Sequence, residues 1–171
     1  RRTIKQKNLD DNGHPRCQVT AMNALLVGRT LLGERCFDIS RAIDLALTYP
    51  QIDGSRILLT GNSGGGTATY YAACLDERIS IAMPSCAVCT FKDSLGAIKH
   101  CTCNFIPSAS LWFEMDDLAA LIAPRRLMVC TGVLDDIFPI EGVRESYRNV
   151  CKIYDKAGVP DACRLLEMPK G

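Results

Sequence analysis

The chain has 171 residues, of which 47% are hydrophobic and 23% charged, and its formal net charge is +1. This length and composition suit one domain, residues 1–171, that is large enough to bury a core. A net charge near zero provides no strong field toward nucleic acid or anionic lipid, and no apolar run is long enough to span a bilayer. We therefore expect neither a nucleic-acid partner nor a membrane partner.

Short apolar strands and helices alternate along the chain, which predicts an α/β fold with a mainly parallel sheet. We expect strands at 56–60, 79–83, 126–131 and 163–167, and helices at 37–49, 67–75, 116–121 and 140–157. Asp116 or Asp117 is the expected cap of the third helix. Residues 84–115 show little periodicity, so this segment is predicted to be irregular, with a short helix at 91–99.

Ten cysteines are spread over the chain, and several, such as Cys130, lie within apolar stretches. Buried free cysteine behaves as a small hydrophobic residue, which favours reduced thiols and a cytoplasmic location. Cys86, Cys89, Cys101 and Cys103 form a denser group that could hold zinc. The single residue between Cys101 and Cys103 is short for a zinc knuckle, so we expect core and loop cysteines and no metal.

The run from Gly61 to Gly65 carries the strongest chemical signal, because it matches the Gly-x-Ser-x-Gly pattern of a nucleophile elbow. An ordinary glycine and serine turn is the competing interpretation. The pattern follows a predicted strand and precedes a predicted helix, which is the arrangement that an elbow requires. We predict that Ser63 is a nucleophile and that the backbone N–H of Gly64 is one oxyanion donor.

An acid and a base are needed to activate such a serine. Asp135 and Asp136 both follow the strand at 126–131, where α/β sheets place functional groups, and each could instead be a turn or capping residue. The only histidines are His14 and His100. Neither follows the last predicted strand, so each is predicted to be a surface or loop residue.

Several segments together resemble the acetyl xylan esterase-like branch of the α/β-hydrolase superfamily, which is related to dienelactone hydrolase-like proteins. They are residues 31–35, 38–44, 53–57, 61–66 and 117–125, and the resemblance extends over roughly residues 25–171. It implies a partial α/β-hydrolase fold with helices on both faces of the sheet. The pattern Gly-x-x-Asp-x-x-x-Pro in these families would select Asp135, between Gly132 and Pro139, over Asp136.

The resemblance also implies that strands precede residue 1 and that a histidine follows Gly171 directly. The chain would then be an internal piece of a longer hydrolase, truncated at both ends and nearly inactive without the histidine. The implied activity is that of a serine esterase that forms an acyl-enzyme on Ser63, needs no metal or organic cofactor, and acts on a small-molecule or carbohydrate ester. The oligomeric state stays open, with a homo-oligomer among the possibilities.

Two other functions remain as alternatives. One is a serine peptidase of the prolyl oligopeptidase type on the same fold, because a fold does not fix the substrate. The other is a non-catalytic, cysteine-rich metal-binding module. The irregular segment could contribute to a substrate pocket through its larger side chains, Phe91, His100, Phe105 and Trp112, although ordinary packing explains them as well.

Overall fold

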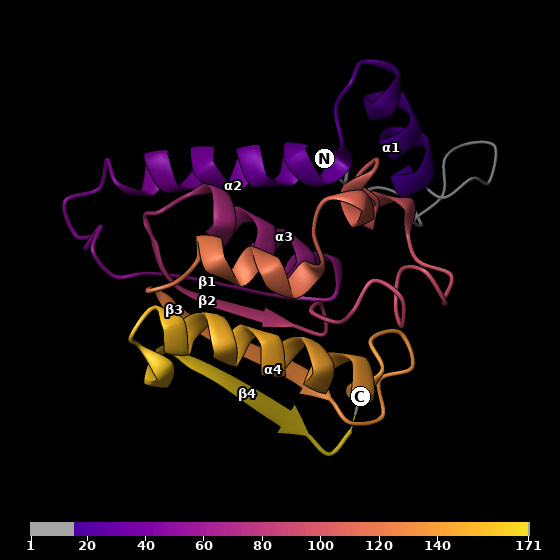
Figure 1. Cartoon of the computed structure of the whole chain (residues 1–171). Helices are drawn as coiled ribbons and strands as arrows, with labels where there is room; N and C mark the ends of the chain where they lie inside the picture. The colour runs from indigo at the N-terminus through magenta and orange to yellow at the C-terminus, as the bar shows by residue number, and fades with distance from the viewer. Residues whose placement is uncertain (1–15, 171) are drawn as a thin grey trace.

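Four parallel strands form the framework of the structure, a computed structural model that describes residues 16–170 (Figure 1). The strands are β1 (Ile57–Asn62), β2 (Ile79–Ser85), β3 (Arg126–Gly132) and β4 (Cys163–Met168). The α-helices are α1 (Arg16–Leu26), α2 (Leu31–Ala46), α3 (Gly64–Leu75) and α4 (Ile140–Lys156). Four short 3-10 helices complete the elements: η1 (Thr102–Asn104), η2 (Ala109–Leu111), η3 (Met115–Leu121) and η4 (Pro160–Ala162).

The strands lie in the order β1-β2-β3-β4, so each strand pairs with the next one along the chain. Parallel neighbours need a crossover connection, and α3, η3 and α4 lie in the three crossovers. The register pairs Asn62 with Ser85 and Gly132 with Met168, so all four strands end along the same edge of the sheet. The predicted parallel α/β fold is confirmed, and this edge is where such folds place their functional groups.

The helices share one core with one face of the sheet. Small side chains on α3, such as Ala72 and Ala73, are buried against β1 and β2, which explains how closely this helix approaches the strands. On the opposite face, Leu58 is 50% exposed and Leu166 is 45% exposed. Within residues 16–170 a helical layer therefore covers one face, and the layer expected on the second face is not found in this part of the chain.

Several expected boundaries need correction. α2 begins six residues earlier than expected because the Thr30 hydroxyl accepts a hydrogen bond from the Gly33 N–H, and it ends at Ala46. Residues 91–99 form turns instead of a helix. The N-cap of η3 is Glu114, which forms a capping box with Asp117, so neither Asp116 nor Asp117 is the cap. α1 was not expected at all.

None of the helices within residues 16–170 has the length and apolar character needed to cross a bilayer.

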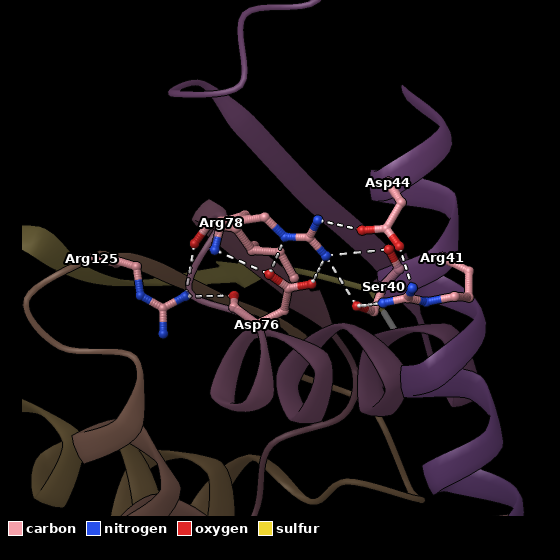
Figure 2. Close-up of polar contacts among 7 residues, drawn as sticks. Ser40, Arg41, Asp44, Asp76, Arg78 and Arg125 are labelled. Atoms are coloured by element: carbon pink, nitrogen blue, oxygen red, sulfur yellow. Dashed lines mark hydrogen bonds and ion pairs between the residues drawn. The ribbon is translucent and has the colours of Figure 1, made fainter. Parts of the chain in front are cut away.

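Two arginines join the elements at the amino ends of the strands, opposite the edge described above (Figure 2). Arg78 precedes β2 and donates hydrogen bonds to both carboxylate oxygens of Asp76, at 2.8 and 2.6 Å, and to Asp44 on α2, at 2.6 Å. These bonds lower the pKa of Asp76 to about 2. Arg125 precedes β3 and donates to four backbone carbonyls, those of Ala73, Asp76, Ile79 and Leu121.

We expect Arg125→Met to destabilise the protein by about 1.5–3 kcal/mol, because it removes charge-assisted hydrogen bonds from carbonyls at the end of α3 and the start of β2. The matched control is Arg126→Met, since this neighbouring arginine is exposed and we expect it to change stability by less than about 0.5 kcal/mol. Urea denaturation of the two variants measures the difference. Equal urea midpoints for Arg125→Met and Arg126→Met would contradict a structural role for Arg125.

Candidate active site

Ser63 lies in the turn between β1 and α3, as the elbow pattern predicts. Its backbone has φ 53° and ψ −121°, a conformation that costs a residue with a side chain about 1–3 kcal/mol. The turn is held by the Ser63 N–H, which donates to the carbonyl of Ser85 at 2.9 Å, and by the Ser63 carbonyl, which accepts from the Thr67 N–H at 2.9 Å. The strained residue is therefore fixed from both sides.

Two glycines make this turn possible. A Cβ on Gly61 would lie 2.6 Å from backbone atoms of Gly65, and a Cβ on Gly66 would lie 2.4 Å from the Ser85 carbonyl oxygen. A Cβ on Gly65 would have no such neighbour within 4 Å, so the second glycine of the pattern is not required for steric reasons. The tight approach involves the backbone of Gly65 and not its missing side chain.

We expect Gly61→Ala to destabilise the protein by about 1–3 kcal/mol, since the new methyl group would push β1 and α3 apart. Gly65→Ala is the matched control, and it should leave stability unchanged or raise it by up to about 1 kcal/mol, because alanine has the higher helix propensity. Thermal unfolding of both variants checks this pair. If Gly65→Ala proves the more damaging change, the close approach has been assigned to the wrong residue.

A cavity of about 910 Å³ opens at the carboxyl edge of the sheet. Its walls come from the ends of β1, β2 and β4 and from the segments that follow each of the four strands. The lining residues are Asn62, Ser63, Ser85, Cys86, 134–138 and 168–170. The structure thus brings Ser63 and both candidate acids to one cavity, although they are more than 70 positions apart in the chain.

Asp135 and Asp136 differ in their contacts. Asp135 is half-buried, and its Oδ1 accepts hydrogen bonds from the N–H groups of Ile137 and Phe138 at 2.8 and 3.0 Å. Asp136 is exposed. The bonds to Asp135 shape the loop before α4 and fix the orientation of the carboxylate, which is what a triad acid requires.

Cys86 lines the same cavity and was not expected there. It follows β2 directly, has a positive φ of 48°, and donates its N–H to the carbonyl of Cys130 at 2.8 Å. Burial and a hydrogen bond to Asp135 raise the pKa of its thiol. Cys86 is therefore a protonated neighbour of the acid and not a thiolate nucleophile. The sequence signal was its position at the end of a predicted strand.

His100 contacts the acid loop from outside the cavity. Ser94 Oγ donates to the carbonyl of Ile137 at 2.7 Å and lies 2.8 Å from His100 Nε2. A hydroxyl has one proton to donate, so Nε2 must carry a proton and donate to Ser94. The imidazole also packs edge-on against Phe138, with ring centroids 5.2 Å apart. Burial lowers the pKa of His100, so the ring is a neutral part of the loop packing. His14 lies outside the described residues.

A second cavity, of about 400 Å³, lies beside the irregular segment and shares no lining residue with the first. Phe91 and Phe105 line it, together with Tyr71 and Glu114. His100 and Trp112 do not, and Trp112 is 83% exposed. Of the four residues suggested for a substrate pocket, two therefore line the second cavity and two do not. None of the four lines the cavity that contains Ser63.

The cysteine group that the sequence suggested is divided by the fold. Cys86 lies beside Asp135, and the sulfur of Cys89 packs against Gly142 on α4. Cys101 and Cys103 instead meet Cys17 of α1, with the three sulfurs within 4.8 Å of one another. The four cysteines therefore do not form the zinc site considered from their spacing.

Comparisons with known proteins find an esterase family and a hydrolase among the similar proteins. A family model described as acetyl xylan esterase matches residues 24–95, which include the elbow. A protein of Bacillus subtilis (strain 168) named "Putative hydrolase YtaP" is 27% identical over 150 residues, which make up 86% of this chain and 50% of that protein. The chain thus spans about half the length of the curated relative that it matches.

Solved structures share the fold. One described as a putative acetyl xylan esterase from Bacteroides fragilis has a TM-score of 0.75 and 20% identity, covering 89% of this chain and 40% of that chain. A glucuronoyl esterase of carbohydrate esterase family 15 from Caldicellulosiruptor kristjansonii has a TM-score of 0.65 and 22% identity, covering 79% and 44%. The chain therefore has a partial α/β-hydrolase fold, and residues 24–95 are similar to acetyl xylan esterases.

Proposed function

We propose that the chain is the nucleophile-bearing part of a serine carboxylic-ester hydrolase that deacetylates a carbohydrate or a small acyl ester. The observation that carries the proposal is the cavity at the carboxyl edge, because it joins Ser63, on its strained turn, to Asp135. The match of residues 24–95 to the acetyl xylan esterase model supports the acetyl group as the acyl part.

In this proposal Ser63 Oγ attacks the ester carbonyl while a histidine takes its proton. The backbone N–H of Gly64 donates to the oxyanion, since the first amides of α3 have no acceptor within the helix. The alcohol leaves with the proton from the histidine and an acyl-enzyme remains on Ser63. The histidine then takes a proton from water as the water attacks the acyl carbonyl, and it passes that proton to Ser63 Oγ as the acid is released.

We propose that the histidine follows Gly171 directly. Support comes from the end of β4, because residues 168–170 line the cavity with Ser63 and Asp135. The Val133 N–H donates to the Met168 carbonyl at 2.8 Å, so this end is joined to the loop that carries the acid. His100 is a weaker candidate, since it does not line the cavity and its Nε2 proton is directed at Ser94.

We also propose that the complete hydrolase domain is longer than the chain. The sheet face with Leu58 and Leu166 exposes apolar side chains that a second helical layer would cover. The chain also spans only 40–50% of the relatives described above.

The test compares the 171-residue chain with a longer protein that contains it and continues past Gly171. We expect the longer protein to hydrolyse p-nitrophenyl acetate and acetylated xylan at least about 10³-fold faster, because the proposed base follows Gly171. Equal rates would contradict the position of the histidine. Hydrolysis of aminoacyl-proline amides in preference to acetyl esters by the longer protein would contradict the esterase proposal and favour a peptidase.

A further inference from the structure

Three cysteines from separate parts of the chain meet outside the cavity described above. Cys17 lies in the first turn of α1, Cys101 precedes η1, and Cys103 lies within η1. Their sulfur atoms are all within 4.8 Å of one another, and the Cys103 thiol donates to the Cys101 sulfur at 3.1 Å. Cys103 is buried, Cys17 is half-buried and Cys101 is exposed, so the group is anchored in the fold and open to solvent on one side.

A guanidinium group contacts two of these three sulfur atoms. Arg35 of α2 donates from Nη1 to the Cys103 sulfur at 3.3 Å and from Nη2 to the Cys17 sulfur at 3.9 Å. Such N–H···S contacts stabilise the thiolate form of cysteine, which is the form that binds metal. A divalent cation and three thiolates together form a complex with a net charge of −1. The positive charge of Arg35 would offset that negative charge.

We propose that Cys17, Cys101 and Cys103 form a binding site for a thiophilic divalent cation, Zn²⁺, with Arg35 as the hydrogen-bonding residue behind the sulfurs. Tetrahedral zinc with Zn–S bonds of about 2.3 Å needs sulfurs separated by about 3.8 Å. The sulfurs of Cys101 and Cys103 are 3.1 Å apart and all three sulfurs lie within 4.8 Å of one another, so small side-chain movements would reach that separation. Water would take the fourth position, on the exposed side of Cys101.

Binding would join α1 to η1 and to α2, since one ligand comes from each of the first two elements and Arg35 comes from the third. The site also adjoins the elbow, because Arg35 Nη1 lies 3.4 Å from the position that a Cβ on Gly64 would occupy. The site is separate from the proposed triad, so it can hold whether or not the esterase proposal does.

Metal uptake by the fully reduced protein tests the site directly. After equilibration with zinc and removal of excess, we expect about one zinc per chain, and Co²⁺ in its place should give a thiolate-to-cobalt charge-transfer band. Cys17→Ser and Cys103→Ser should each weaken zinc binding by at least about tenfold, whereas the control Cys151→Ser, at a half-buried cysteine outside the group, should not. No band and no zinc in the unaltered protein would overturn the proposal.

Alkylation of the unaltered protein gives a second test that does not depend on whether a variant folds. Bound zinc should slow the reaction of iodoacetamide with Cys17, Cys101 and Cys103 and leave the rate at Cys151 unchanged, as measured by peptide mass spectrometry. Protection of a different set of cysteines would overturn the assignment. The proposal would also be overturned if the three sulfurs form a disulfide and the protein takes up no zinc after complete reduction.

Discussion

Ser63→Ala should abolish ester hydrolysis in a protein that contains both the elbow and its base, lowering kcat for p-nitrophenyl acetate by about 10³- to 10⁶-fold. The change removes one oxygen atom and keeps the Cβ, so the strained backbone and its hydrogen bonds to Ser85 and Thr67 persist. We therefore expect the same fold, a similar KM for the ester, and complete loss of labelling by a fluorophosphonate probe. Assay of kcat and mass spectrometry of the labelled peptide check both expectations.

The matched control is Ser110→Ala, because Ser110 lines the second cavity and not the one at the carboxyl edge. We expect it to keep activity within about twofold. A large loss in Ser110→Ala with activity retained in Ser63→Ala would place the chemistry in the 400 Å³ cavity and contradict the elbow assignment.

Ser63→Gly extends the same experiment to stability. Glycine adopts positive φ without the cost of a Cβ, so the substitution should raise the free energy of unfolding by about 1–2 kcal/mol while it removes activity. In an ordinary surface turn the serine would have an unstrained backbone conformation, so its replacement by glycine would not raise the free energy of unfolding. A stabilised but inactive variant would identify Ser63 as a residue retained for function at the expense of stability.

The strands, the elbow and α4 were predictable because each has a signal in a short stretch of sequence. Apolar runs such as 126–131 mark buried strands, and Val143 and Val150 repeat at helical spacing on α4. The elbow needs glycine at position 61 for a steric reason that acts within five residues. Local physics therefore determined the position of Ser63 before any long-range contact was known.

The surroundings of the site were not predictable in the same way. Cys17 meets Cys101 only because α1 packs against η1, and the 83 residues between them contain no pattern that predicts this contact. His100 reaches the acid loop through Ser94, inside a segment without periodicity. The sequence spacing of Cys86 and Cys101 suggested one cluster, whereas the turn after β2 directs Cys86 toward Asp135.

Asp135→Asn should lower kcat by about 10⁴-fold, the second largest effect that we expect, because an amide cannot hold the histidine in the required tautomer or stabilise its charged form. The asparagine Oδ1 can still accept from the N–H groups of Ile137 and Phe138, so the loop should keep its shape. Loss of activity without loss of stability is thus the expected combination, measured by ester hydrolysis and urea denaturation of the same longer protein.

Asp136→Asn removes the same charge one residue away and is the matched control. Asp136 lines the cavity but is exposed and accepts no hydrogen bond from Ile137 or Phe138, so we expect kcat to stay within about twofold. Equal losses in the two variants would mean that the negative charge of the loop matters and not an oriented carboxylate. A loss confined to Asp136→Asn would exchange the roles of the two aspartates, and the hydrogen bonds to Asp135 would then serve only to shape the turn before α4.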